Sequence, residues 1–296
     1  MRILNFGSMN IDYVYSVDHI LQEGETLLSD DRHIFTGGKG MNQSVAMGRA
    51  GLPVWHAGCV GEEGKWMLEE LRKSNVDVSL VKVRSDVPSG HTVIQKDREG
   101  RNCIMLFGGA NRMVSEEQAD ETLTHFGEGD VLVLQNEISS LSYIMTKAHE
   151  KGMKIIMNPS PVDAVIPTLP LVFADLFFVN EIEASQITEC SAEDTEALLE
   201  GLRQKFPDAK VVLTLGGAGS VYMDREKIVR QPAVPVHVAD TTAAGDTFSG
   251  YFLAGFLQDM PVEAALKLAA AAAGIAVSRA GAAPSIPFMK EVQEYI

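Results

Sequence analysis

Short apolar runs alternate with longer segments of mixed polarity through the second half of the chain. Four runs of this kind occur, at residues 131–134, 154–157, 176–179 and 211–215. Such runs are typical of strands that are buried on both faces of a parallel sheet. Helix-like segments separate them, for example at residues 141–151 and 193–205. The alternation predicts an α/β fold in which helices flank a doubly wound, mainly parallel sheet with right-handed crossovers.

Polar residues stand at the end of each of these predicted strands. Asn136 and Glu137 follow the first strand, Asn158 and Asn180 follow the next two, and Thr214 lies at the end of the fourth. Open α/β sheets bind ligands outside the carboxyl ends of their strands. The four endings together predict a rim of ligand-facing groups, although asparagine after a strand is also an ordinary turn former.

A second, smaller sheet is predicted in the first half of the chain. Residues 90–96 and 101–107 flank a short polar turn like the two strands of a hairpin. Two strands alone are marginally stable, so the extended stretches 13–17 and 31–35 are expected to join them. We expect segments of about 13–36 and 90–108 to form a β lid projecting from a single domain that spans residues 1–296. The alternative is an edge extension of the main sheet.

The composition of the chain argues against several classes of binding partner. The 296 residues carry a net charge of −15, with a sequence pI near 4.9, which opposes binding to nucleic acid. The three cysteines lie far apart, so neither a disulfide framework nor a zinc site is expected. The longest apolar run, at residues 268–277, is too short to span a membrane. The chain starts in a strand-like segment without signal-peptide features, and a cytoplasmic location is expected.

The segment Asp-Thr-Thr-Ala-Ala-Gly-Asp-Thr at residues 240–247 carries the clearest chemistry. Large apolar residues follow it at helical spacing, so it reads as a loop that opens a buried helix. The small residues Ala243, Ala244 and Gly245 let the free amides of the helix start approach an anion. Asp246 would then stand beside a phosphoryl group as a general base. The alternative is that Asp246 only caps the helix.

A glycine cluster at residues 37–42 precedes another predicted helix, at residues 43–49. It could bring Lys39, Asn42 and the backbone close to a polyhydroxy ligand, or it could be a flexible turn. Neither glycine cluster is a Walker loop or a dinucleotide fingerprint, because the spacings GxxxxGK[ST] and GxGxxG are absent. The sequence therefore favours a small-molecule site of another kind.

Five separated motifs resemble those of the ribokinase-like (PfkB-type) carbohydrate kinases. They are Gly7-Ser8-Met9-Asn10-Ile11-Asp12, the cluster 37–42, Asn180-Glu181-Ile182-Glu183, residues 214–219 and residues 240–246. The resemblance runs from Gly7 to Pro287. It implies an ATP-dependent kinase that transfers the γ-phosphoryl group to a sugar hydroxyl with the help of Mg²⁺. It also implies D-ribose as the acceptor, with D-ribose 5-phosphate as the product.

The resemblance assigns roles to individual residues. Sugar binding falls to Asn10, Asp12, Gly38, Lys39, Gly40, Asn42, Glu137 and Asp246. The catalytic segment is Ala243, Ala244, Gly245 and Asp246, with Asp246 as the base. Nucleotide binding falls to Asn180, Thr214, Leu215, Gly216, Gly217, Ala218, Gly219 and Gly245. Asn180 and Glu183 would hold Mg²⁺ through water, because that ion dehydrates reluctantly.

The resemblance also implies an activating K⁺ ion and a dimer. The residues that match the family's monovalent-cation site are Asp240, Thr242, Ala276, Arg279, Gly281 and Ser285. The exposed edges of the lid are expected to pair with a second subunit, as lids do in ribokinase-like kinases. The sequence departs from the family at Ala269 and Ala270, where many members place a polar residue against adenine. Adenine specificity is therefore left open.

Two other functions remain open at this point. Another member of the family could phosphorylate fructose, deoxyribose, adenosine or pseudouridine with the same machinery. A phosphosugar is disfavoured, because Lys39 is the one evident cation in the sugar-binding segments. A sensor that binds without catalysis is disfavoured as well, since it would be expected to lose Asp246 or the small residues before it.

Overall fold

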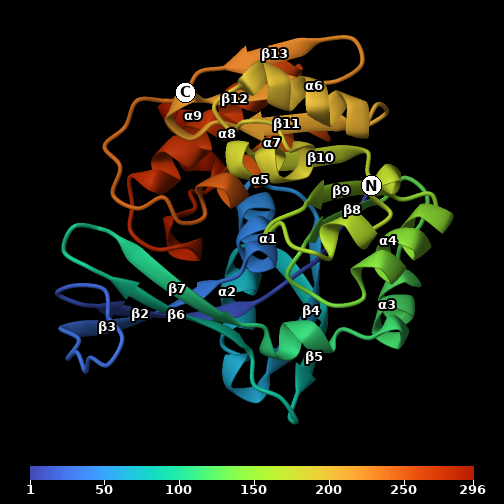
Figure 1. Ribbon diagram of the computed structural model, residues 1–296. Coiled ribbons are helices and arrows are strands. Elements are labelled where there is room, and N and C mark those ends of the chain that lie inside the picture. The colour runs from blue at the N-terminus through green and yellow to red at the C-terminus, as the bar shows by residue number, and fades with distance from the viewer.

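The computed structural model describes residues 1–296, which form a large and a small β-sheet with helices around the large one (Figure 1). The large sheet has nine strands in the order β13-β12-β11-β10-β9-β8-β1-β4-β5. The only antiparallel pairings in it are β11 with β12 and β12 with β13. The strands are β1 (Ile3–Phe6), β4 (Val54–Gly61), β5 (Val76–Arg84), β8 (Val131–Gln135), β9 (Lys154–Asn158), β10 (Leu176–Asn180), β11 (Lys210–Thr214), β12 (Ser220–Met223) and β13 (Ile228–Gln231). The predicted α/β class and its four buried parallel strands are thus confirmed.

Helices cover both faces of this sheet. Successive residues of each central strand point to opposite faces, so Val131 and Val133 enter one core while Leu132 and Leu134 enter another. One face is covered by α1 (Lys39–Arg49), α2 (Met67–Lys73), α7 (Ala244–Phe256), α8 (Val262–Val277) and α9 (Met289–Tyr295), and the other by α3 (Glu116–Leu123), α4 (Leu141–Glu150), α5 (Glu181–Thr188) and α6 (Thr195–Lys205). No helix is both long and apolar enough to cross a membrane.

The small sheet, which we call the lid, projects away from the large sheet at the lower left of Figure 1. Its four strands lie in the order β3 (Asp31–Gly37), β2 (Asn10–Ser16), β6 (Gly90–Lys96) and β7 (Asn102–Phe107). It shares no strand with the large sheet, so the expectation of a separate sheet is confirmed and the edge-extension alternative is wrong. Strand β2 begins at Asn10, three residues before the predicted stretch, because its first residues pair with Gly37 and Gly90.

Two helices bring their first turns to the edge where the parallel strands end. Helices α1 and α7 pack against each other so closely that a Cβ atom on Gly250 would lie 2.4 Å from the Cβ of Ala46. A larger residue at position 250 would therefore push the helices apart. Because α1 and α7 are in direct contact, the residues at their N-termini lie close to each other and to the ends of β9, β10 and β11.

Candidate active site

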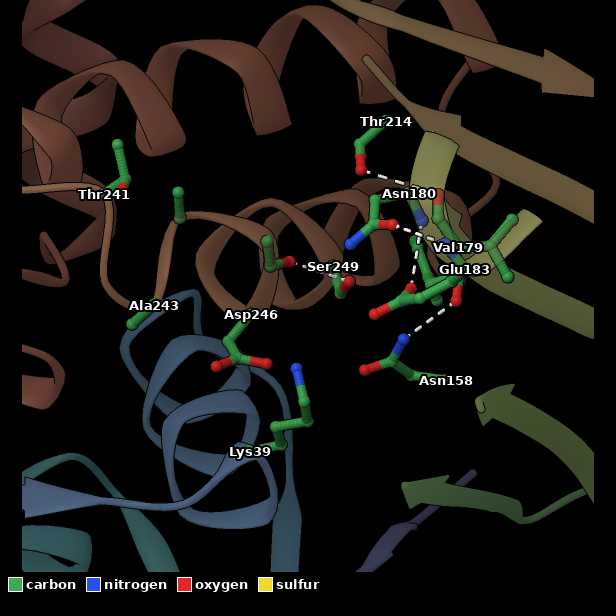
Figure 2. Close-up of a pocket in the computed structure, with 13 residues that line it drawn as sticks. Lys39, Asn158, Val179, Asn180, Glu183, Thr214, Thr241, Ala243, Asp246 and Ser249 are labelled. Atoms are coloured by element: carbon green, nitrogen blue, oxygen red, sulfur yellow. Dashed lines mark hydrogen bonds between the residues drawn. The ribbon is translucent and has the colours of Figure 1, made fainter. Parts of the chain in front are cut away.

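A cavity of about 210 Å³ opens at the carboxyl ends of the central strands. It is lined by Lys39, Asn158, Phe178, Val179, Asn180, Glu183, Thr214, Thr241, Ala243, Ala244, Gly245, Asp246 and Ser249. Figure 2 shows Lys39 and Asp246 reaching toward each other from α1 and α7, with Asn158, Asn180 and Glu183 on the opposite side. The strand-end asparagines Asn158 and Asn180 thus share one site, as the pattern of strand endings predicted.

Asp246 lies in the first turn of α7 with its carboxylate held by two amide groups. Asn42 Nδ2 donates to Asp246 Oδ2 over 3.0 Å, and Gln43 Nε2 donates to Asp246 Oδ1 over 2.9 Å. Neither oxygen bonds a backbone amide of α7, whose N-cap residue is Ala243 and has no side-chain cap. The alternative that Asp246 only caps its helix is therefore wrong. Its carboxylate lines the cavity and is hydrogen-bonded to two side chains of α1.

The charges around Asp246 are closely balanced. Burial raises the pKa of the Asp246 carboxyl, while the Lys39 ammonium and the amides of Gln43 and Asn42 act against that rise. Burial lowers the pKa of Lys39, but the carboxylates of Asp246, Glu137 and Glu183 outweigh it, so the net direction is upward. Lys39 therefore carries its positive charge inside the site.

The first turn of α7 can hold an anion. The Ala244 amide donates to the Thr241 carbonyl over 3.2 Å, but the amides of Gly245 and Asp246 have no backbone partner. The positive end of the helix dipole also lies there. Ala243 has a left-handed backbone, with φ of 59°, and this turn brings Ala244 and Gly245 onto the wall of the cavity. A Cβ atom on Gly245 would meet nothing within 4 Å, so open space lies in front of this turn. The structure thus provides the geometry expected of a phosphate-binding helix start.

Asn180 and Glu183 lie together at the start of α5. They form a capping box, in which Asn180 Oδ1 accepts from the Glu183 amide over 2.8 Å and Glu183 Oε2 accepts from the Asn180 amide over 3.0 Å. Both side chains also line the cavity, so they are not a purely structural helix start. A carboxylate and an amide oxygen that are already fixed by backbone groups fit a magnesium ion bound through water.

The predicted nucleotide loop continues from the edge of this cavity. Thr214 lines the cavity, and Leu215, Gly216, Gly217, Ala218 and Gly219 follow it outside, with residues 216–218 exposed. Ala269 and Ala270 do not contact the cavity. Both are buried in the core between α8 and its neighbours, and the expectation about adenine stays a prediction.

Glu137 links the end of β8 to the start of α1. The Ser8 hydroxyl and the Lys39 backbone amide, at 2.9 Å, both donate to Glu137 Oε2. Helix α1 has no side-chain cap of its own, because residue 38 is glycine. Glu137 therefore takes the position of a capping carboxylate from a distant part of the chain. Ser8 Oγ also accepts from the Gly40 amide over 3.2 Å, and a Cβ atom on Gly38 would lie 3.1 Å from the same oxygen, so both glycines lie beside this contact.

Asn10 and Asp12 lie at the start of β2, where Asn10 pairs with Gly37 of the glycine cluster, and neither residue lines the cavity. Asn10 Oδ1 accepts from Asn111 Nδ2 over 2.7 Å, and Asp12 Oδ1 accepts from the Thr92 hydroxyl over 2.6 Å. Burial, together with the nearby Glu137, raises the pKa of Asp12 to about 6, although Thr92 opposes the rise. Sequence reasoning missed Asn111 and Thr92, because no local motif marks either residue.

The residues predicted to bind a monovalent cation are only partly brought together. Asp240 Oδ1 accepts from the Thr242 amide at 3.0 Å and the Thr242 hydroxyl at 2.6 Å, while Asp240 Oδ2 faces the Gly281 amide at 3.4 Å. The nearest cation is Lys96 of the lid, whose Nζ lies 3.6 Å from Asp240 Oδ2. Two residues make other contacts: Arg279 pairs with Glu291, and the Ser285 hydroxyl donates to the Ala282 carbonyl. The Ala276 carbonyl accepts a hydrogen bond from the Arg279 amide just beyond the end of α8.

Comparison with known proteins agrees with this geometry. Residues 2–289 match the family model described as the pfkB family carbohydrate kinase. The ribokinase of Haemophilus influenzae is 32% identical, over 98% of this chain and 96% of its own length. The ribokinase of Cryptococcus neoformans in complex with ADP superposes with a TM-score of 0.88 at 32% identity, over 100% of this chain and 99% of that one. The ribokinase of Arabidopsis thaliana complexed with ribose and ATP gives 0.89 at 29% identity, over 99% and 98%. The chain belongs to the pfkB family of carbohydrate kinases.

Proposed function

We propose that the protein transfers the γ-phosphoryl group of ATP to the 5-hydroxyl of D-ribose. The observation that carries the proposal is the position of Asp246. Its carboxylate faces the Lys39 ammonium inside a cavity that also contains the start of α7 and the Asn180–Glu183 pair. This arrangement combines a base, a cation and an anion-binding helix start within one small space, which is what phosphoryl transfer needs.

In the proposed reaction, the sugar hydroxyl donates its proton to Asp246 as its oxygen attacks the γ-phosphorus, and the bond from the γ-phosphorus to the β,γ-bridging oxygen breaks to release ADP. The free amides at the start of α7 donate hydrogen bonds to the negatively charged oxygens of the transferred group. Lys39 lines the same cavity as the start of α7, so we propose that its ammonium also faces that charge, in addition to the sugar hydroxyls suggested by sequence. Mg²⁺, held through water by Asn180 and Glu183, supplies charge neutralisation at the nucleotide phosphates.

The sugar is expected to bind beside Asp246, under the lid. Asn10, Asp12 and Glu137 provide oxygen acceptors there, and Asn42 Oδ1 is a buried acceptor without a partner. Such groups suit a ligand with several hydroxyls. D-ribose is favoured because the relatives described above are named ribokinases. Another sugar or a nucleoside of the same family's range is the second candidate.

A cation site and a dimer belong to the same proposal, as does a cytoplasmic location. The carboxylate of Asp240 is an oxygen ligand of the kind that suits a hard cation such as K⁺. The edge strand β7 exposes Ile104, Met105, Leu106 and Phe107, and an apolar edge of this kind is suited to pairing with a second copy. Equal turnover with and without K⁺ would remove the first idea, and a mass of 32.1 kDa in solution would remove the second.

The first experiment incubates the protein with Mg-ATP and K⁺ and measures the release of ADP in the presence of one acceptor at a time. The acceptors are ribose, deoxyribose, fructose, adenosine and pseudouridine. Preferential turnover of ribose supports the proposal, and preference for another acceptor keeps the mechanism but replaces the substrate. Asp246→Asn should lower kcat at least about 100-fold. The variant should still bind ribose and ATP, as measured by thermal shift. A loss of only a few-fold in kcat would show that Asp246 is not the base.

A further inference from the structure

Three buried amide side chains form a continuous chain that ends on Asp246. Gln43 Nε2 donates to Asp246 Oδ1 over 2.9 Å, and Gln43 Oε1 accepts from Gln135 Nε2 over 2.6 Å. Gln135 Nε2 also donates to Asn5 Oδ1 over 3.0 Å. We call Gln43, Gln135 and Asn5 the amide relay. It crosses from α7 through α1 to β8 and β1, and its members are at most 2% exposed.

The direction of every hydrogen bond in the relay is fixed at its far end. Asn5 Nδ2 donates to the backbone carbonyl of Gly40 over 2.6 Å. Because a carbonyl can only accept, the nitrogen of Asn5 must face Gly40 and its oxygen must face Gln135. Because Asn5 presents its oxygen to Gln135, Gln135 must present its nitrogen in return. The same nitrogen, Gln135 Nε2, donates to Gln43 Oε1. Gln43 is left with its N–H groups, and not its oxygen, toward Asp246.

A second backbone carbonyl sets the same orientation independently. Asn158 Nδ2 donates to the carbonyl of Phe178 over 2.9 Å, so Asn158 Oδ1 faces the cavity and accepts from Gln43 Nε2 over 3.2 Å. Both N–H groups of Gln43 are therefore used, one by Asp246 and one by Asn158. Two separate anchors thus exclude the flipped amide, which would place an oxygen against the carboxylate.

We propose that Gln43 is a positioning residue for Asp246, and that Gln135 and Asn5 hold it with an N–H directed at the carboxylate. This inference rests on the proposed function, in which Asp246 is the base. Burying three amides in a core costs free energy, and Gln135 Oε1 has no partner, so an apolar side chain at position 43 would be the simpler way to fill this space.

Two consequences for catalysis follow. A hydrogen bond to the ionised carboxylate favours that form, so Gln43 opposes the effect of burial and keeps Asp246 able to take a proton. The bonds from Gln43 and Asn42 to different oxygens also stop the carboxylate from rotating, which keeps it aligned with the attacking hydroxyl. Removing the Gln43 donor should therefore change the pH dependence of turnover as well as its rate.

The test compares Gln43→Met, which removes the amide, with Gln43→Glu, which keeps its shape but places a carboxylate against Asp246. In Gln43→Met the acidic limb of kcat/KM should move up by about one pH unit, and kcat at pH 7 should fall about tenfold. KM for ribose should stay within about threefold. Gln43→Glu should move the acidic limb further and lower kcat at pH 7 more than Gln43→Met does, because two carboxyl groups then face each other.

The matched control is Gln118→Met. Gln118 is also 2% exposed and also bonds through its amide, to the Gly58 carbonyl at 2.9 Å, but it lies in α3 away from the cavity. It should lose stability as the Gln43 variants do while keeping the wild-type pH profile. Should Gln43→Met not fold, Gln135→Met tests the next link, and a smaller shift in the same direction is expected.

The outcomes separate this inference from the proposed function. An unchanged acidic limb in Gln43→Met, or activity in Gln43→Glu that equals or exceeds that of Gln43→Met, would mean that residue 43 only fills space. That result overturns the positioning role even when Asp246→Asn is inactive. If Asp246→Asn remains active, the base assignment has failed, and the positioning role fails with it.

Discussion

The pH dependence of sugar binding should report directly on Asp12. Burial raises the pKa of its carboxyl to about 6, where it can titrate within the range of an ordinary binding experiment. The ionised carboxylate accepts hydrogen bonds from hydroxyl groups, whereas the protonated form has less capacity to accept. With a pKa of about 6, the ionised fraction falls from nearly all at pH 8 to roughly one tenth at pH 5. The dissociation constant for ribose should therefore rise about tenfold over this range.

Calorimetric titration of ribose without nucleotide is the appropriate assay, because it does not depend on Asp246 acting as a base. Asp12→Asn should bind ribose more weakly at pH 8 and show little change with pH. Thr92→Val removes the hydroxyl that donates to Asp12 at 2.6 Å, so the pKa of Asp12 should rise by about one unit. At pH 7 this variant should bind ribose about twofold more weakly than the wild type. A wild-type dissociation constant that is flat from pH 8 to pH 5, or an equal slope in Asp12→Asn, would refute the reasoning.

Two further predictions concern stability. Arg49 is 8% exposed and donates to the carbonyls of Ala283 and Ile286 and to Glu70, so Arg49→Met should lower the free energy of unfolding by about 3–5 kcal/mol. The control is Arg72, which makes an exposed ion pair with Glu69, and Arg72→Met should lower the free energy of unfolding by less than about 1 kcal/mol. Denaturant titration measures both variants, and equal losses in Arg49→Met and Arg72→Met would contradict the role of burial. Burial lowers the pKa of His56 from 6.5 to about 4, so the folded state binds fewer protons than the unfolded state between these values. Stability should therefore fall by up to about 3 kcal/mol as the pH drops from 6.5 to 4, and His56→Asn should show a smaller fall over that range.

The sequence by itself determined the elements and the local motifs. The runs that became β8 to β11 were visible because strands covered on both faces must be apolar along their whole length. The capping box of Asn180 and Glu183 could be read from its spacing, since both partners lie within one helical turn. The start of α7 and the glycine cluster before α1 were also visible as local patterns. The order of these motifs was enough to indicate the family.

Only the tertiary structure decided which side chains meet. Gln43 and Asp246 are 203 residues apart, and Asn10 and Asn111 are 101 residues apart, so neither contact leaves a local signal. Lys39 follows a glycine cluster visible in the sequence, but only the packing of α1 against α7 places its ammonium in one cavity with Asp246. A helix or strand is specified by neighbours along the chain, because its hydrogen bonds and hydrophobic period are local. The relative placement of two helices depends on how closely their surfaces pack, as at Gly250 and Ala46, and that is a property of the whole fold.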